Sequence, residues 1–104
     1  MSGPLAGLTV LEVCDELGQF AGKLLADLGA EVTKIEPPDG SSARRVGPFV
    51  KDIPGPNRSL NFWYNNTNKR SAVLDLDGSE ADREAFRALA STADVVLEDR
   101  APGA

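Results

Sequence analysis

Short apolar segments rich in β-branched residues alternate along this chain with longer segments of helical periodicity. Residues 8–13, LTVLEV, and 31–35, EVTKI, predict two strands. Between them, Asp15 is placed to cap a helix, and Gly29 is placed to end it in the left-handed conformation. The apolar positions of this helix recur every 3.6 residues and are expected to be buried against the sheet: Leu17, Phe20, Ala21, Leu24, Leu25 and Leu28.

The same alternation returns in the second half of the chain. Residues 72–76, AVLDL, predict a third strand, and residues 94–97, DVVL, predict a fourth. Ser79 and Asp82 have the spacing of a capping box, which predicts that a helix starts near Ser79. The expected buried stripe of this helix is Ala85, Phe86, Leu89 and Ala93.

Two strand–helix–strand units joined by a long connection indicate an α/β fold with a Rossmann-like parallel sheet. Parallel neighbours need crossover connections, and the helices of those connections cover the sheet. The connection, from residue 39 to about residue 57, is irregular, and the following residues 58–66 leave open a short helix or a turn that buries Leu60, Phe62 or Trp63. Ligands of such sheets bind beyond the carboxyl ends of the strands. Those ends are followed by residues 14–18, 36–40, 75–78 and 98–101.

Composition narrows the chemistry available to the chain. It has 104 residues, enough for one domain, with no histidine and with Cys14 as its only cysteine. A disulfide framework, a Cys-based metal site and a histidine base are therefore excluded, and we interpret Cys14 as a small buried hydrophobe at a strand end. No stretch approaches the roughly 20 apolar residues that span a bilayer, so we expect a cytoplasmic protein.

Charge is distributed unevenly along the sequence. Residues 41–70 contain six basic residues and one acid, which gives this segment a net charge of +5 in a chain whose total is −5. Loop cations and exposed backbone N–H groups together suit the oxygen atoms of a phosphate. The segment therefore favours a small phosphorylated ligand, while a solvated loop that balances the acidic remainder is the alternative.

Two other ligands fit less well. A nucleic acid is disfavoured by the negative total charge and by the clustering of the aromatic residues 62–64. For a dinucleotide, Glu36 ends the second strand about where a ribose-binding acid would lie, yet the preceding turn, DELGQFAG, lacks the G-x-G-x-x-G pattern.

Four blocks of the sequence resemble successive blocks at the start of the family III CoA-transferases. This family includes formyl-CoA and carnitine-CoA transferases and the related α-methylacyl-CoA racemases. The blocks are PLAGLTVLEV, AGKLLADLGAEVTKIEPPDG, NNTNKRSAVLDL and ADVVLEDRAPGA, and the resemblance runs over essentially all 104 residues. The resemblance implies that residues 1–104 are the N-terminal part of a Rossmann-like large domain in a longer protein.

The resemblance also implies a function. Transferases of this family move CoA between carboxylic acids: an aspartate attacks the acyl-CoA carbonyl, and the reaction passes through a mixed anhydride and an aspartyl-CoA thioester. That aspartate lies beyond the blocks present here, so the chain is expected to carry no catalytic residue and to be inactive on its own. The family further implies an interlocked homodimer, with acyl-CoA and a carboxylic acid as small-molecule partners and no metal.

The binding residues implied for CoA come from three places. The N-K-R-S segment lies along the CoA site in the family, and neighbouring side chains of an extended segment point opposite ways, so only one of the two adjacent cations faces the ligand. The turn after the first strand and the block after the fourth strand supply the others. The implied CoA-binding residues are Asp15, Leu17, Asn68, Lys69, Arg70, Asp99 and Arg100.

Departures from the family pattern keep alternatives open. The turn at Leu17, Gly18 and Gln19 replaces an Ala-Gly-Pro turn and is one residue shorter. Asp99 replaces the Asn of a frequent E-N-F-R-P-G block and adds a negative charge near the expected phosphates. A non-catalytic pseudo-transferase or interaction domain, a racemase-type enzyme and a generic nucleotide-binding domain are the alternatives.

Overall fold

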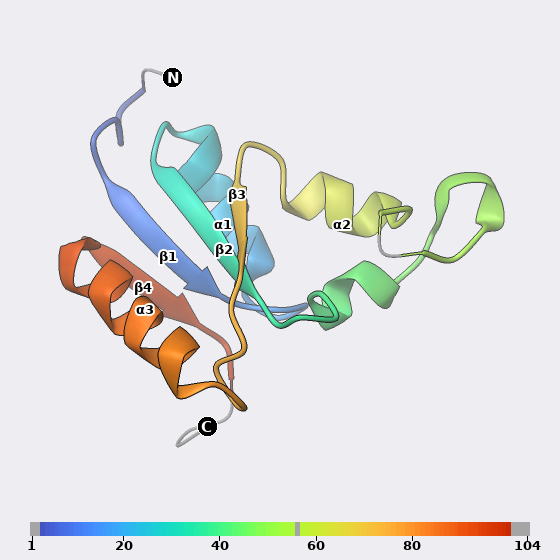
Figure 1. Ribbon diagram of the computed structural model, residues 1–104. Coiled ribbons are helices and arrows are strands. Elements are labelled where there is room, and N and C mark those ends of the chain that lie inside the picture. Colours follow the sequence, from blue (N-terminus) through green and yellow to red (C-terminus); the bar gives the residue numbers. More distant parts are fainter. Residues whose placement is uncertain (1–2, 56, 101–104) are drawn as a thin grey trace.

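Four parallel strands form one sheet, seen in the computed structural model of the protein (Figure 1). The structure describes residues 3–55 and 57–100. The strands are β1 (Thr9–Val13), β2 (Glu31–Glu36), β3 (Arg70–Val73) and β4 (Val95–Glu98). They lie in the order β3-β2-β1-β4, and every pair is parallel. The predicted α/β fold with a parallel sheet is therefore confirmed.

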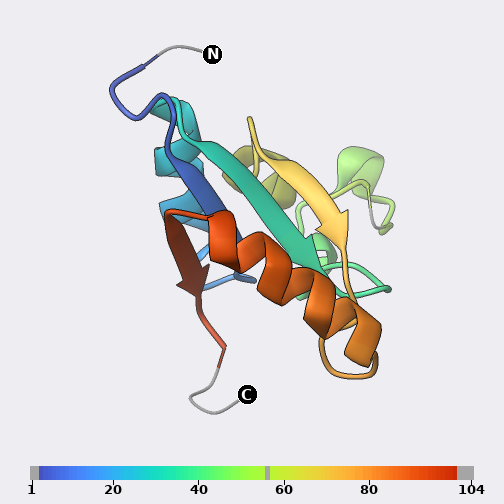
Figure 2. The same cartoon turned by 60° about the vertical axis from the view of Figure 1, so that its left-hand side comes forward.

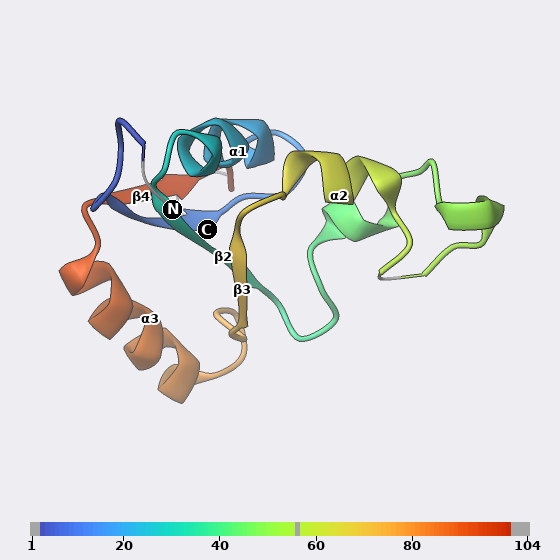
Figure 3. The same ribbon diagram turned by 90° about the horizontal axis from the view of Figure 1, so that it is seen from above.

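Helices cover both faces of the sheet. The helices α1 (Gln19–Asp27) and α2 (Leu60–Asn65) lie on one face and α3 (Glu80–Thr92) on the other, as Figure 3 shows from above. Figure 2 shows α3 running across its face of the sheet. The connection between β2 and α2 contains two short 3-10 turns, Ser42–Arg45 and Val50–Asp52. The connections from β1 to β2 and from β2 to β3 cross one face of the sheet, whereas the connection from β3 to β4 crosses the other. The sheet therefore has its switch point between β1 and β4, where ligands of doubly wound sheets bind.

The core is divided by the sheet into two clusters. Val10 and Val32 pack under α1 with Ala26 and Ala30, whereas Leu11 packs on the α3 side. This division follows from the alternation of side chains along each strand. Leu74 and Leu76 were predicted in a strand, but they lie beyond the end of β3 and still pack against the α3-side cluster.

The buried face of α1 differs from the prediction. Its buried residues are Gln19, Gly22 and Ala26, whereas Leu24 and Leu28 are about half exposed, at 48% and 47%. Leu25 is partly buried against the core. The expected burial of Leu24 and Leu28 was wrong, as was that of Leu17, Phe20 and Ala21, because small and polar residues let the helix approach charged groups on the sheet. The outer face that results is an apolar stripe of Leu17, Phe20, Leu24 and Leu28.

The helix ends show which capping predictions hold. Asp15 does not cap α1, whose N-cap is Gly18; the Asp15 carboxylate instead accepts a hydrogen bond from Ser41. Ser79 does cap α3, because its hydroxyl accepts a hydrogen bond from the backbone N–H of Asp82 at 3.2 Å. Ala85 and Leu89 were predicted to be buried on α3, but both are exposed, Leu89 to 42%.

Gly22 is the position at which α1 comes closest to the sheet. A Cβ at this position would lie 1.8 Å from Oε1 of Glu12 and 3.1 Å from Nζ of Lys69. The Glu12 side chain is fully buried and paired, so it cannot swing away. We expect Gly22→Ala to lower the free energy of unfolding by about 1–3 kcal/mol, although alanine is the better helix former.

Urea denaturation would measure this effect, with Ala21→Gly as the matched control. Ala21 is exposed on the same helix, so its replacement should cost about 1 kcal/mol through helix propensity alone. A Gly22→Ala variant as stable as the unaltered chain would contradict the close approach.

Candidate ligand-binding site

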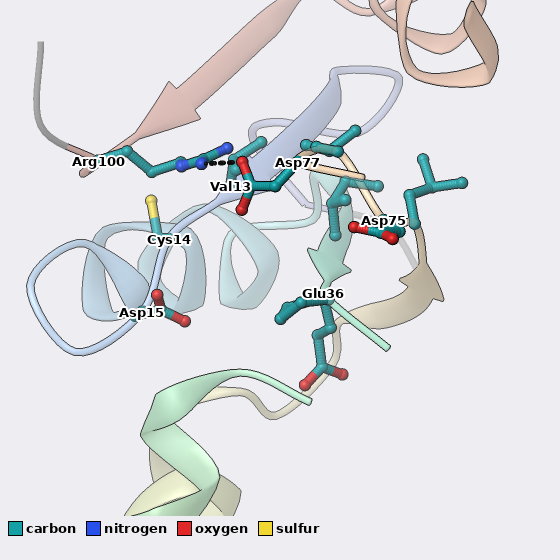
Figure 4. Close-up of a pocket in the computed structure, with 11 residues that line it drawn as sticks. Val13, Cys14, Asp15, Glu36, Asp75, Asp77 and Arg100 are labelled. Atoms are coloured by element: carbon teal, nitrogen blue, oxygen red, sulfur yellow. Dashed lines mark hydrogen bonds and ion pairs between the residues drawn. The ribbon is translucent and has the colours of Figure 1, made fainter. Parts of the chain in front are cut away.

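A pocket of about 240 Å³ opens at the carboxyl ends of β1, β2 and β3 (Figure 4). We call it the strand-end pocket. It is lined by Val13, Cys14, Asp15, Ile35, Glu36, Pro37, Leu74, Asp75, Leu76, Asp77 and Arg100. This is the place that the rule for parallel sheets predicts for a ligand.

Negative side chains dominate the lining of the strand-end pocket. Four carboxylates line it, those of Asp15, Glu36, Asp75 and Asp77. Arg100 is the one cation of the lining, and its Nη2 lies 2.7 Å from Oδ1 of Asp77. Because like charges repel, this pocket suits an uncharged part of a ligand better than a phosphate.

Glu36 is held in its ionised form at the edge of this pocket. Its Oε1 and Oε2 accept bidentate hydrogen bonds from the Arg44 guanidinium at 2.6 and 2.8 Å. The backbone N–H of Ser41 and the hydroxyl of Ser71 donate at 2.9 and 2.5 Å. Burial alone would raise the pKa of Glu36, but these hydrogen bonds and the Arg44 charge outweigh it and lower the pKa to about 2.

The turn between β1 and α1 is closed by a carboxylate from the end of β4. Asp99 accepts hydrogen bonds from the backbone N–H groups of Asp15, at 3.0 Å, and Gly18, at 2.8 Å. A Cβ at Gly18 would lie 2.6 Å from Sγ of Cys14, so a residue without a side chain is needed there. Asp99 therefore satisfies two donors that an external anion would otherwise use at the switch point.

Cys14 lies beside this turn and is buried. Burial, followed by the negative charges of Glu12 and Asp99, raises the pKa of its thiol from 9.0 to about 12. The thiolate is the reactive form of cysteine, so Cys14 is inert near neutral pH. This agrees with the interpretation of Cys14 as a small buried hydrophobe.

Beneath α1 lies a cluster of three buried charges, which we call the buried triad: Glu12, Lys34 and Lys69. Nζ of Lys34 lies 2.7 Å from Oε2 of Glu12, and Nζ of Lys69 lies 2.5 Å from Oε1. All three side chains are at most 2% exposed. Burial lowers the pKa of Lys69, against the effect of Glu12, which raises it.

Sequence reasoning gave no role to two members of the buried triad. Glu12 and Lys34 are direct register partners on β1 and β2. The signal available in the sequence was an acid, Glu12, inside the apolar segment TVLEV and a base, Lys34, inside the segment EVTKI. Opposite charges on paired central strands satisfy each other, which makes such positions tolerable in a core.

The structure divides the predicted CoA-binding residues between two ends of the sheet. Asp15, Leu17, Asp99 and Arg100 gather at the carboxyl ends of β1 and β4. At the opposite end, Asn68 and Arg70 line a separate pocket beside the first residues of β2.

The two adjacent cations of the N-K-R-S segment point in opposite directions, as extended backbone predicts. The Lys69 side chain is 2% exposed and faces Glu12, whereas the Arg70 side chain is 75% exposed and pairs with Glu31 at 2.9 Å. Asn68, which precedes them, donates to the carboxylate of Asp27 on α1 at 2.9 Å.

Most cations of the basic segment 41–70 have partners within the protein. Arg44 pairs with Glu36, and Arg58 donates to the carbonyl oxygens of Val50 and Ile53. Among the described residues, the cations of this segment without a partner are Arg45 and Lys51. Most of the positive charges in residues 41–70 are therefore engaged in contacts within the protein.

Comparisons with known proteins identify the family to which the chain belongs. The sequence matches the CoA-transferase family III over residues 5–104. It is 44% identical over 94 residues to the succinyl-CoA:(R)-benzylsuccinate CoA-transferase subunit BbsE of Thauera aromatica, covering 90% of this chain and 23% of that protein. It is 42% identical over 100 residues to the succinate–glutarate CoA-transferase of Agrobacterium fabrum, covering 92% of this chain and 25% of that protein.

Two solved structures are similar to the chain over nearly all of its length. The hypothetical protein Rv3272 of Mycobacterium tuberculosis superimposes with a TM-score of 0.83 at 39% identity, over 98% of this chain and 27% of that one. A CAIB/BAIF family protein of Brucella suis superimposes with a TM-score of 0.80 at 39% identity, over 94% of this chain and 26% of that one. The chain belongs to the family III CoA-transferases.

The chain spans about a quarter of the length of the relatives that it matches. Within residues 3–55 and 57–100, no helix is long and apolar enough to cross a membrane. The same part of the chain holds no group of three or more His, Cys, Asp or Glu side chains arranged to bind a metal ion.

Proposed function

We propose that the chain is the N-terminal CoA-binding portion of an enzyme that moves CoA between carboxylic acids. The observation that carries this proposal is the family match over residues 5–104, together with two relatives above 40% identity whose names specify CoA transfer involving dicarboxylic acids. The substrates are an acyl-CoA and a free carboxylic acid. The enzyme is cytoplasmic.

The reaction proceeds by covalent catalysis on a carboxylate outside this chain. That carboxylate attacks the thioester carbonyl, and the C–S bond breaks to give a mixed anhydride and CoA thiolate. The thiolate then attacks the enzyme's acyl carbon, which releases the first acid and leaves an aspartyl-CoA thioester. The second acid reverses these steps, so atoms and charge balance without a metal or a redox partner.

Residues at the switch point contribute to CoA binding in this proposal. Leu17 is 87% exposed on the turn after β1 and offers an apolar contact beside the strand-end pocket. Arg100 is the cation that lines the strand-end pocket, and the hydrogen bond from the backbone N–H of Asp15 to Asp99 holds the turn after β1. Asn68, Lys69 and Arg70 of the N-K-R-S segment complete the proposed set, with Asn68 and Arg70 at the opposite end of the sheet and Lys69 buried against the end of the turn.

The enzyme is a homodimer in this proposal. The support comes from α1, where Phe20, Leu24 and Leu28 form an outer apolar stripe that is about half exposed within the described residues. Exposed apolar stripes of this kind mark contact surfaces.

Titration calorimetry with CoA tests the proposed function. Arg100→Gln should weaken CoA binding at least about tenfold if its guanidinium contacts a phosphate, because a hydrogen bond to a charged group contributes roughly 1.5–3 kcal/mol. Arg87→Gln is the matched control, since Arg87 is also an ion-paired arginine but lies on α3. Raising the salt concentration should weaken binding by screening these charges.

A second function is favoured by Asp99. Its carboxylate already occupies the backbone donors of the switch-point turn, as a bound anion would. This arrangement suits a pseudo-transferase that keeps the fold and has lost tight CoA binding. Absence of CoA binding by the folded chain in the same calorimetry would overturn the enzyme proposal and support this second function.

A further inference from the structure

We propose that Lys69 is a positioning residue, which sets the conformation of the turn between β1 and α1 through the buried triad rather than contacting a phosphate. The inference rests on the proposed function, because this turn carries Asp15 and Leu17 of the proposed CoA site. It replaces direct phosphate contact by Lys69 with an indirect role.

The first argument is the number of acceptors around Lys69. An ammonium group has three donor hydrogens. Nζ of Lys69 lies 2.5 Å from Oε1 of Glu12, 2.8 Å from the carbonyl oxygen of Gln19 and 2.8 Å from Oδ1 of Asn66. The contacts with Gln19 and Asn66 are hydrogen bonds and the contact with Glu12 is an ion pair, so the ammonium group is engaged within the protein, and the side chain is 2% exposed.

The second argument is where those acceptors lie. Gln19 is the first residue of α1 and therefore the end of the turn. Lys34, the other cation of the buried triad, donates to the carbonyl oxygen of Cys14 at 2.7 Å, at the start of the turn. Because both lysines share the Glu12 carboxylate, one buried cluster fixes both ends of the turn.

Asn66 strengthens the anchor at Gln19. Its Nδ2 donates to Oε1 of Gln19 at 2.9 Å, while its Oδ1 accepts from Lys69. Gln19 is thus held by both its main chain and its buried side chain. Between the two anchored ends lie the backbone N–H groups of Asp15 and Gly18 that Asp99 binds, so a shift of Gln19 would move these donors.

The charge balance makes this role separable from folding. The buried triad has two cations and one anion. Removing Glu12 would leave two buried ammonium groups uncompensated, whereas removing the Lys69 charge leaves a neutral Glu12–Lys34 pair. Lys69→Met therefore releases the turn without stranding an unpaired buried cation.

The test compares Lys69→Met with Lys23→Met in the 104-residue chain. Lys23 is the matched control because its ammonium pairs with Asp27 on α1 and does not touch the turn. We expect Lys69→Met to weaken CoA binding about tenfold, because the released turn no longer holds Asp15 and Leu17 in place. The dependence of its affinity on salt concentration should equal that of the unaltered chain, because no phosphate contact is lost.

A second readout needs no ligand. Hydrogen exchange of the Asp15 and Gly18 amides, followed by NMR, should speed up about tenfold in Lys69→Met, while amides of β1 and β2 that report global unfolding keep their rates. If Lys69→Met does not fold, Asn66→Ala removes the anchor at Gln19 without changing a charge and should show the same local effect.

The outcomes separate the inference from the proposed function. A reduced salt dependence in Lys69→Met would identify a direct phosphate contact and overturn the inference, as would unchanged exchange at both amides. If the unaltered chain does not bind CoA, the proposed function fails, while faster exchange at Asp15 and Gly18 alone still supports the positioning role.

Discussion

Glu12→Gln is expected to lower the free energy of unfolding by about 3–5 kcal/mol, the usual cost of breaking a buried ion pair by removing one partner. The carboxylate of Glu12 is 0% exposed and lies within 2.7 Å of the ammonium groups of Lys34 and Lys69. A neutral amide leaves these two cations facing each other in the interior, where repulsion is poorly screened. Chemical denaturation of the purified chain would measure the loss.

Glu84→Gln is the control for this substitution. Glu84 pairs with Arg87 on α3, but both side chains are more than half exposed. Exposed pairs of this kind contribute little, so we expect a change below about 1 kcal/mol. Equal effects of the two substitutions would show that the buried triad does not stabilise the fold.

The sheet could be predicted from the sequence because each strand carries its own local signal. The segment LTVLEV and its counterparts are short, apolar and bounded by turn residues. The ends of three strands were therefore predicted within one residue, whereas the third strand was predicted to start two residues late and to end three residues late. The same local signal extended the predicted third strand over residues 74–76. Apolar residues that pack beyond the end of a strand have the same composition as residues within it.

The buried face of α1 could not be predicted from periodicity alone. Leucines recur at helical spacing, and the hydrophobic effect favours their burial in an isolated domain. The structure instead buries Gln19 and Gly22, because the triad beneath them requires close approach and hydrogen-bond partners. Pairing between Glu12 and Lys34, 22 residues apart, depends on strand register, which local pattern does not specify.

The sequence predicted where the pocket lies but not which contacts form around it. The rule for parallel sheets located the strand-end pocket, and alternation along an extended segment predicted that Lys69 and Arg70 point apart. Which of the two faces inward depends on Glu12. The contact of Asp99 with Gly18 joins residues 81 positions apart, so no local pattern could reveal it.

Acid should remove the stabilising effect of Glu36 between about pH 4.5 and pH 2. The pKa of Glu36 is about 2 in the folded chain and has an ordinary value of 4.5, so below pH 4.5 the unfolded chain takes up a proton that folded Glu36 does not. Stability from this group is therefore complete above pH 4.5 and is lost as the pH falls through 2. The difference corresponds to about 3 kcal/mol.

Comparison with Glu36→Gln isolates this contribution, since the other acids titrate in both proteins. The stability difference between the unaltered chain and Glu36→Gln should shrink by about 3 kcal/mol between pH 5 and pH 2. Glu31→Gln serves as the control, because Glu31 is 54% exposed in its pair with Arg70 and should give a nearly constant difference. A difference for Glu36→Gln that stays constant with pH would mean that Arg44, Ser41 and Ser71 do not favour the ionised carboxylate, and that the connection after β2 is held by some other contact.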